Sequence, residues 1–535
     1  MRPAGIDRAA LLSAALLAVS MACGAPAQAG ANNAGVARCG SRKVAAIGRG
    51  CRDLLRAEAR FLRNGDGAAR AARIAAVGGR LTAEWSRAEA AAADARCAAR
   101  SADADAAAAR LTAAVSAATA AVPGSVECRR ALVGLWAPLC RSAVASERAA
   151  LRGAASAAPA HLRARIAARW PAPGCAGGPD AAAASRTILR LAAGAAADAT
   201  TRGLRPLGAD IGVAVGAAIE PDEVASDVDY TSALAHDIDS LTAENVMKWG
   251  VVHPQPATWN FGPADAVVAR AEAAGQRVRG HTLNWGALQL PGYVSAATTA
   301  GELRAHMAEP IAGLVGRYAG RVAQWDVVNE PLPGFLEAPT PDGLDDNIFH
   351  QRLGADYIAE ALYLARAADP TARLYINENG LEVPGAKQDR FFALVQALLA
   401  AGAPLDGIGF QAHLGLVPPG QYPNAATIEA SLRRFADLGL DVELTEVDVT
   451  LLFVSGALPA RFAVQGDDYR ALGEACAAVP RCRGITTWGL NDQYSWLRPF
   501  LGATDWPLPF DEAWRRKPAY FGLRAGLLYG RLSMN

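Results

Sequence analysis

The sequence predicts a small all-α domain linked by disulfides, followed by a (β/α)8 barrel. Three observations support this fold class. The chain has 535 residues, which is too long for one ordinary domain. Residues 30–170 favour helix almost throughout, and six of the nine cysteines lie between residues 39 and 175. From about residue 205, eight short β-prone runs alternate with helical stretches.

The first 29 residues are typical of a secretory signal peptide. Arg2 and Arg8 give a positive start, residues 9–22 form a short apolar run, and residues 27–29 fit a small-x-small cleavage site. The run is too short for a lasting membrane span. We therefore expect a secreted or periplasmic protein without a membrane span. The alternative is a lipid anchor on Cys23, although Ser20 stands where that signal usually has leucine.

Charge and cysteine content narrow the class of protein further. The formal net charge is +1, which suggests neither a nucleic-acid partner nor an acidic membrane partner. Without Cys23, eight cysteines remain, and an even number fits disulfides in an oxidising compartment. A zinc site is disfavoured because no Cys-x-x-Cys pair or nearby histidine is present. Fifteen pairings are possible among the first six of these cysteines, namely Cys39, Cys51, Cys97, Cys128, Cys140 and Cys175.

Residues 30–170 form the predicted helical domain, whose role the sequence leaves open. Alanine buries little area per residue, so disulfides would offset a thin core. The domain is either a spacer or folding appendage, or a carbohydrate- or partner-binding module. Trp85, Trp136 and Trp170 would stack on sugars in the second case, but packing is the favoured interpretation. The expected helices are 46–63, 68–100, 104–122 and 127–168, with breaks at 64–67 and 123–124 and further divisions at Pro138 and Pro159.

Residues 171–200 are expected to be a linker and a connecting helix, and residues 201–535 the barrel domain. A doubly wound open sheet is the alternative to the barrel. It would need a glycine-rich phosphate loop after the first strand, and residues 212–216 do not supply one. The predicted strands are 211–218, 241–245, 277–285, 323–330, 373–378, 407–413, 442–449 and 484–490. Helical stretches at 264–274, 300–318, 355–368, 390–401 and 427–438 separate them.

Polar residues fall at the carboxyl ends of six of these strands, where barrel enzymes place their catalytic groups. They are Glu244 and Asn245, His281, Asn329 and Glu330, Gln411 and His413, Glu446 and Asp448, and Trp488. We interpret Trp249 and Trp325 as core residues and Asp326 as a structural partner of the site.

Glu330 and Glu446 form a candidate pair for glycoside hydrolysis. In that reaction one carboxylic acid protonates the leaving oxygen, and the other carboxylate attacks or activates water. The proton donor needs a raised pKa, whereas the nucleophile needs hydrogen bonds to its ionised form. His413 and Asp448 are placed to supply such a network to Glu446, and strand periodicity puts Glu446 and Asp448 on one side of their strand.

Short motifs with these residues follow one another in a fixed order. They are residues 242–249, 279–283 with Trp285, 325–330, 406–414, 444–448, and 484–490 with Asp492, Ser495 and Trp496, followed by 517–520. In order and spacing, residues 205–525 resemble glycoside hydrolase family 10, the endo-β-1,4-xylanase family. The helical region resembles no family that we identified.

The resemblance implies a role for each matching residue. Glu330 would be the general acid/base and Glu446 the nucleophile of a retaining mechanism, with Asn329, His413 and Asp448 in support. Residues lining the glycone side of the cleft would be Glu244, Asn245, Lys248, His281, Trp285, Gln289, Gln411, Trp488 and Trp496. The substrate would be xylan or xylo-oligosaccharides, and neither a cofactor nor a metal is implied. Cys476 and Cys482 would form a local disulfide, as the family often shows.

Two departures from the family pattern concern substrate contacts. Gly286 follows Trp285 where the family commonly has histidine. Residues 377–380 read Asn-Glu-Asn-Gly, where the family often reads Asn-Asp-Tyr-Asn. The aromatic residue missing at Asn379 predicts weaker stacking on the aglycone side and altered product sizes.

The leading hypothesis is a secreted, monomeric endo-β-1,4-xylanase. The alternatives are another β-1,4-glycanase, such as a cellulase-like enzyme or an arylglycosidase, and a catalytically idle glycan-binding protein.

Overall fold

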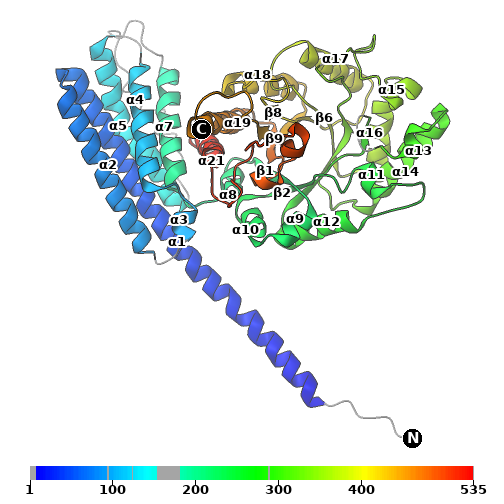
Figure 1. The fold of residues 1–535 in the computed structure, drawn as a ribbon, viewed down its shortest axis with the longest axis horizontal. Coiled ribbons are helices and arrows are strands. Elements are labelled where there is room, and N and C mark those ends of the chain that lie inside the picture. Colours follow the sequence, from blue (N-terminus) through cyan, green and yellow to red (C-terminus); the bar gives the residue numbers. More distant parts are fainter. Residues whose placement is uncertain are drawn as a thin grey trace. The chain divides into compact units, whose positions relative to one another are not determined.

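The structure is a computed structural model that describes residues 8–92, 96–122, 125–152, 181–286, 290–335 and 337–533. The chain divides into two compact units, of which the first ends at Arg202 and the second begins at Gly203 (Figure 1). The predicted linker at residues 171–180 lies outside the described residues.

The first unit is a helical bundle. Its helices begin where the sequence provides side-chain caps, since Asp66, Asp103 and Ser125 accept hydrogen bonds from the first-turn amides of α2, α4 and α5. The described helices are α1 (Arg8–Asn64), α2 (Gly67–Ala90), α3 (Arg96–Ala99), α4 (Ala104–Ala120), α5 (Val126–Ala150) and α7 (Ala181–Ala199). The residues of α7 belong to the stretch 171–200, which we predicted to be a linker and a connecting helix between the domains. In the structure α7 packs against α1, α4 and α5, and Arg110 pairs with Asp198 near its end at 2.9 Å.

Helix α5 runs through Pro138, so the prediction that this proline divides the helix is wrong. A proline inside a helix removes one backbone hydrogen bond. Here the buried side chains of Trp136, Leu139 and Cys140 hold the helix against the bundle on both sides of the proline. Pro159 lies outside the described residues.

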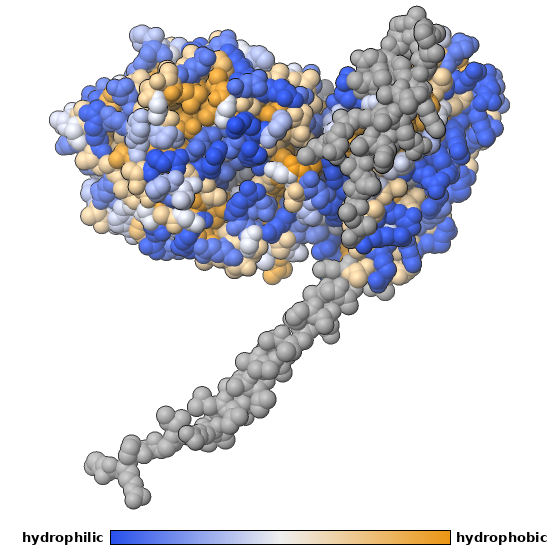
Figure 2. Space-filling view, turned by 180° about the vertical axis from the view of Figure 1, so that it is seen from behind, coloured by the Kyte–Doolittle hydropathy of each residue, from blue (hydrophilic) through white to orange (hydrophobic). Residues whose placement is uncertain are grey.

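The two described tryptophans of this unit belong to its core. Trp85 is 0% exposed and Trp136 is 2% exposed, so neither ring presents a face on which a sugar would stack. Trp170 lies outside the described residues. The face of this unit seen in Figure 2 is mostly hydrophilic where it is not grey, as expected for a bundle whose apolar side chains point inwards.

Disulfides join α1 to two other helices of the bundle. Cys39 is bonded to Cys97, and Cys51 to Cys140. Cys128 is disulfide-bonded as well, and Cys175 lies outside the described residues.

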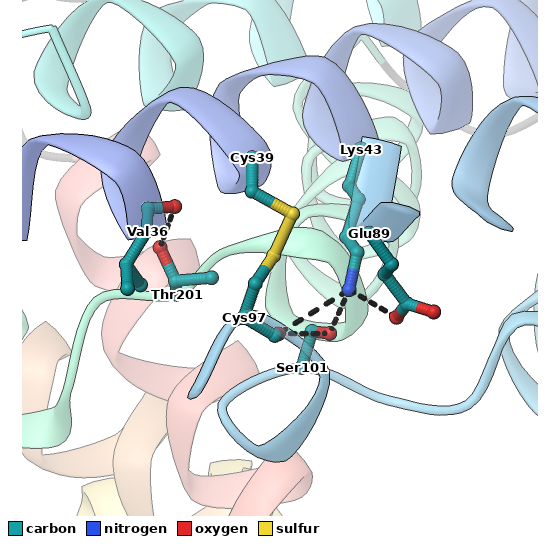
Figure 3. The surroundings of a disulfide bond; sticks show 7 residues. All are labelled: Val36, Cys39, Lys43, Glu89, Cys97, Ser101 and Thr201. Carbon is teal, nitrogen blue, oxygen red and sulfur yellow. Dashed lines mark hydrogen bonds and ion pairs between the residues drawn. A yellow bond between two sulfur atoms is a disulfide. The ribbon is translucent and has the colours of Figure 1, made fainter. Parts of the chain in front are cut away.

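The first bridge lies beside a fully buried lysine, Lys43 (Figure 3). Its ammonium group is 2.5 Å from Glu89 Oε1, and it also donates to Ser101 Oγ and to the carbonyl oxygen of Cys97. Burial lowers the pKa of Lys43 despite the Glu89 carboxylate. The Cys39–Cys97 disulfide and the Lys43–Glu89 ion pair therefore lie next to each other and together link α1 to α2 and α3.

Removing the Cys39–Cys97 bridge by a double substitution to alanine should destabilise the bundle by about 4 kcal/mol, because the bridge closes a loop with a sequence separation of 58. Hydrogen exchange would then speed up in peptides from α1 to α4, while barrel peptides stay unchanged. The matched control removes the Cys476–Cys482 bridge, whose separation is 6. It should cost about 2 kcal/mol and affect the barrel alone. Equal protection in the wild type and the first variant would contradict this account.

The second unit is a closed parallel barrel, which confirms the predicted fold. The strands pair in the order β10, β1, β2, β3, β5, β6, β7, β9, and β9 pairs with β10 to close the ring. Two short strands extend its rim, since β4 pairs with β5 and β8 pairs with β9. The strands are β1 (Ala214–Ile219), β2 (Ser240–Ala243), β3 (Arg277–Gly280), β4 (Asn284–Trp285), β5 (Gln324–Asn329), β6 (Arg373–Glu378), β7 (Gly407–Phe410), β8 (His413–Leu414), β9 (Asp441–Val449) and β10 (Cys482–Thr487).

Helices surround the barrel and cover its strands (Figure 1). Each of these helices buries at least one of its side chains. They are α8 (Leu204–Ala209), α9 (Pro221–Ser226), α10 (Val228–Asp237), α11 (Trp249–Val252), α12 (Gly262–Ala274), α13 (Gly292–Ser295), α14 (Ala300–Arg317), α15 (Ile348–Leu353), α16 (Tyr357–Ala368), α17 (Ala386–Ala400), α18 (Ala425–Ala436), α19 (Leu458–Ala478), α20 (Leu497–Leu501) and α21 (Pro518–Ser533), with a 3-10 turn at Asp492–Tyr494. The expected disulfide between Cys476 and Cys482 joins α19 to β10.

The barrel interior holds a buried ion network. Arg279 on β3 is 1% exposed, donates to both carboxylate oxygens of Asp326 on β5, and reaches Glu443 on β9 at 3.0 Å. Glu443 also accepts hydrogen bonds from Gln324 and Tyr375. Because each charge has a partner, the network fixes three strands relative to one another beneath the carboxyl ends that carry the site.

Among the described residues, no helix has an apolar stretch long enough to cross a membrane. Helix α1 includes residues that the sequence assigns to a leader, and the signal peptide stays a prediction.

Candidate active site

Glu330 and Glu446 stand at the carboxyl ends of β5 and β9, as predicted. Glu330 follows the last residue of β5 and has a φ of +52°, a left-handed conformation that is uncommon outside glycine. Its backbone N–H donates to Asn377 on β6 at 2.8 Å. Glu446 is 5% exposed, and its N–H donates to the carbonyl oxygen of Gln411 at 2.9 Å. Backbone hydrogen bonds therefore hold both residues in place. The left-handed conformation of Glu330 is a local strain of the kind found at functional sites.

Two amide side chains connect the carboxylates through Asn329. Asn377 donates to Glu446 Oε1 at 2.6 Å and to Asn329 Oδ1 at 2.8 Å. Gln411 donates to Glu330 Oε1 at 2.8 Å and reaches Asn329 Oδ1 at 3.4 Å. The amide oxygen of Asn329 receives both contacts, so its NH₂ group is left to donate elsewhere.

Asn377 was not among the residues that the sequence singled out. It lies one residue before the end of the predicted fifth strand. The criterion applied to six other strands, a polar residue at the carboxyl end, would have identified it.

Glu446 has an environment that favours its ionised form. Its Oε2 lies 3.2 Å from His413 Nε2, and His413 Nδ1 lies 3.0 Å from Asp448. Burial alone would raise the pKa of Glu446, but His413 and His281 hold it below its ordinary value. Burial opposes the charge on His413, whereas the carboxylates of Asp448 and Glu446 raise the pKa of His413 well above its ordinary value. Trp496 completes the chain by donating to Asp448 Oδ2 at 2.8 Å.

His281 approaches Glu446 from the other side. Its Nδ1 is 3.0 Å from Asp326 and 3.9 Å from Glu446 Oε1. Asp326 thus joins the buried network of Arg279 to the site, which confirms that it is a structural partner. The ring of Trp488 contacts His281 edge-on, with centroids 5.0 Å apart. Trp325 and Trp249, interpreted as core, are 0% and 3% exposed.

Trp285 contacts the other carboxylate directly. Its indole N–H donates to Glu330 Oε2 at 2.9 Å, and the ammonium group of Lys248 lies 5.0 Å from its ring centroid. Lys248 donates to Asn245, which in turn donates to Glu220. The predicted polar residues after β2 and the tryptophan after β3 therefore form one continuous surface.

Glu244 lies beneath this surface and is buried. Burial raises the pKa of Glu244 to about 8, and the nearby carboxylates of Glu220 and Glu223 add to the effect. Burial likewise raises the pKa of Glu223 to about 7. Glu220 and Glu223 follow β1. No site residue was predicted after this strand.

The two sequence departures have structural counterparts. A Cβ atom at Gly286 would lie 2.4 Å from the side chain of Asn347, so Asn347 fills the space that a larger residue would need. Asn379 is contacted by Lys387, whose ammonium group is 2.6 Å from Asn379 Oδ1 and 2.9 Å from Glu378 Oε1. Burial raises the pKa of Glu378 to about 7. Gln289 lies outside the described residues.

Among the described residues, no group of three histidine, cysteine, aspartate or glutamate side chains is arranged to hold a metal ion.

Comparisons with known proteins agree with this arrangement. The profile of Glycosyl hydrolase family 10 matches residues 203–525. Endo-1,4-beta-xylanase A of Phanerodontia chrysosporium is 38% identical over 307 residues, which cover 56% of this chain and 71% of that protein. Endo-1,4-beta-xylanase of Agaricus bisporus is also 38% identical over 307 residues, covering 56% of this chain and 87% of that protein.

Solved structures are similar over the same region. Native xylanase 10B from Thermotoga maritima has a TM-score of 0.55 and 32% identity, covering 61% of this chain and 98% of that chain. Xylanase 10B from Thermotoga petrophila RKU-1 in complex with xylobiose has a TM-score of 0.56 and 31% identity, covering 61% and 97%. The helical bundle lies outside the region that the family profile matches.

Proposed function

The chain belongs to glycosyl hydrolase family 10, and on that basis we propose that it is a secreted endo-β-1,4-xylanase that retains the configuration of the anomeric carbon. The observation that carries the proposal is the contrast between the two carboxylates. The two histidines His413 and His281 lower the pKa of Glu446, whereas the donors to Glu330 are the neutral side chains of Trp285 and Gln411. One carboxylate is prepared to attack and the other to exchange a proton.

In the first step, Glu446 attacks the anomeric carbon of the xylose on the glycone side. The glycosidic C–O bond breaks, and Glu330 gives its proton to the leaving oxygen. The product is an ester between Glu446 and the sugar. The NH₂ group of Asn329 would donate to the sugar 2-hydroxyl, since its oxygen is already occupied by Asn377 and Gln411. That hydrogen bond would strengthen in the transition state.

In the second step, Glu330 acts as a base. It takes a proton from water, which attacks the anomeric carbon and releases Glu446 as a carboxylate. On the glycone side, Lys248, Asn245 and Trp285 would bind the hydroxyls and ring face of the sugar, together with Glu244, His281, Gln411, Trp488 and Trp496.

Export and domain boundaries are part of the same proposal. The leader-like residues 1–29 and the disulfides on α1 and α19 support secretion or a periplasmic location. We keep residues 30–170 as a helical domain of unknown role and residues 201–535 as a monomeric catalytic domain. Of the predicted connection, residues 171–200, the part at 181–199 forms α7 and packs with the helical bundle.

Product stereochemistry and substrate choice test the function. Proton NMR of a xylo-oligosaccharide digest should show the β-anomer first. Reducing sugar should be released from xylan. Initial appearance of the α-anomer would overturn retention, and release from β-glucan but not xylan would favour another β-1,4-glycanase.

Replacing His413 with glutamine should move the acidic limb of the kcat/KM profile to higher pH by about one unit. The sign follows from the lowered pKa of Glu446. Without the cation beside it, Glu446 is protonated at a higher pH, so less of the enzyme carries the ionised nucleophile in mildly acidic solution. The measurement is a pH profile on an aryl xylobioside. An unchanged acidic limb with a lower kcat at every pH would show that His413 only positions Glu446.

A further inference from the structure

A groove of about 260 Å³ lies beside the mouth of the barrel, between the loops that follow β5, β6 and β8. Its polar and aromatic lining consists of Phe335, Glu337, Lys387, Gln388, Arg390 and Gln421. The groove adjoins the acid/base side of the site. Phe335 comes five residues after Glu330, and Lys387 pairs with Glu378, the last residue of β6.

Phe335 gives the groove an aromatic wall. The side chain is 43% exposed, and its ring packs against Gly380, where an added Cβ atom would lie 2.7 Å from Cε2 and Cζ. Any larger residue at position 380 would displace the ring. The ammonium group of Lys387 lies 5.3 Å from the centroid of this ring, and the part of the ring that stays exposed presents an aromatic face over the same turn in which Asn379 replaces the aromatic residue expected from the family. Such a face suits the C–H side of a pyranose ring.

Arg390 lines the groove with a positive charge. Among the described residues, no carboxylate pairs with its guanidinium group. Its Nε is buried and has no hydrogen-bond acceptor in that part of the chain. Buried donors are normally paired, so an acceptor in the groove, either water or a ligand, would complete the hydrogen bonding of this guanidinium. Helix α17, which has 15 residues, begins in the groove wall at Ala386 without a side-chain cap, and a helix N-terminus favours anions.

The other charged groups of the lining are already engaged. Lys387 is paired with Glu378 at 2.9 Å. Glu337 is the single acidic residue among the described lining residues, and its Oε2 accepts a hydrogen bond from the backbone N–H of Gly334 at 2.9 Å. Arg390 is thus the group available for an incoming carboxylate, and arginine binds carboxylates in a planar, directional manner.

We propose that this groove binds a uronic acid side group carried by the part of the xylan chain that leaves from Glu330. The pyranose ring of the side group lies against Phe335, and its carboxylate pairs with Arg390. The proposal rests on the xylanase function proposed above. Under this proposal, aglycone binding is not weak in general. The aglycone side of the cleft instead prefers xylan chains that carry uronic acid groups.

The test compares kcat/KM on xylan bearing uronic acid side groups with kcat/KM on the same polymer after chemical reduction of its carboxyl groups. Arg390→Gln should lower kcat/KM about tenfold on the acidic polymer and leave the reduced polymer almost unaffected. The matched control is Arg277→Gln, an exposed arginine at the opposite end of the barrel, where β3 begins. It should change neither value. Phe335→Ala should lower kcat/KM on both polymers, and Phe335→Tyr should restore it.

A measurement on the wild type keeps the proposal testable if a variant misfolds. Raising the salt concentration from about 0.05 M to about 0.5 M should lower kcat/KM on the acidic polymer and not on the reduced one. Cleavage of both polymers with no salt effect, or an equal loss on both in Arg390→Gln, would overturn the groove assignment alone. Failure to cleave either polymer would overturn the xylanase function and the groove assignment with it.

Discussion

Replacing Glu446 with alanine is expected to lower kcat on xylan by on the order of 10⁵-fold, while the melting temperature changes little. The reason is that the first step forms a bond to this carboxylate and no neighbouring group can take its place. His413 and Asn377, which hold Glu446 ionised, have no nucleophilic oxygen to offer. The measurement is reducing-sugar release by purified protein, with Glu429→Ala on the solvent-accessible side of α18 as the control for a lost carboxylate.

Azide should restore turnover of this variant on an aryl xylobioside. The small anion enters the space left by the carboxylate and attacks the anomeric carbon from the same side as Glu446 would. Only one displacement then occurs, so the product is the α-glycosyl azide, with inverted configuration. Formation of the β-glycosyl azide would contradict the assignment of Glu446 as the nucleophile.

Much of this site could be read from the sequence because its residues are local to strand ends. Glu330 directly follows β5, His413 begins the short strand β8, and Glu446 lies in the carboxyl-terminal half of β9. The (β/α)8 pattern brings the carboxyl ends of all these strands to one face. Strand boundaries shifted by a few residues, as with β1, which begins at Ala214 and not at residue 211. Such shifts did not matter, because the assignment of the site residues needs only their place near the carboxyl-terminal part of a strand and not an exact strand boundary.

The contacts of Asn377, unlike its position at the end of a strand, could be recognised only from the structure. The two hydrogen bonds that Asn377 donates depend on the register that places it beside Asn329. They also depend on Gly409, where a Cβ atom would lie 2.1 Å from Asn377 Oδ1. Neither relation is visible along the chain. Phe335 and Gly380 likewise meet only because two rim loops fold together. The sequence therefore indicated a missing aromatic residue on the aglycone side but not the ring that lies over the same turn.

Replacing Glu330 with alanine should have a different signature. Hydrolysis of xylan is expected to slow by about 10³ to 10⁴-fold, because its leaving group must be protonated and Glu330 is the proton donor. An aryl xylobioside whose phenolate leaves without protonation should still form the ester with Glu446 at a near-normal rate. Hydrolysis of that ester then becomes slow, since no base activates the water. The ester accumulates, kcat is limited by its breakdown, and KM falls.

The azide product also distinguishes the role of Glu330 from that of Glu446. In Glu330→Ala azide needs no general base, so it should attack the accumulated ester from the face opposite Glu446 and raise kcat. Two displacements have then occurred, and the product is the β-glycosyl azide, the opposite anomer from that of Glu446→Ala. Trp285 and Gln411, which donate to Glu330 in the wild type, remain to line the space that the anion enters. The same azide anomer from both variants would mean that the two carboxylates do not act on opposite faces of the sugar, and the double-displacement mechanism would be wrong.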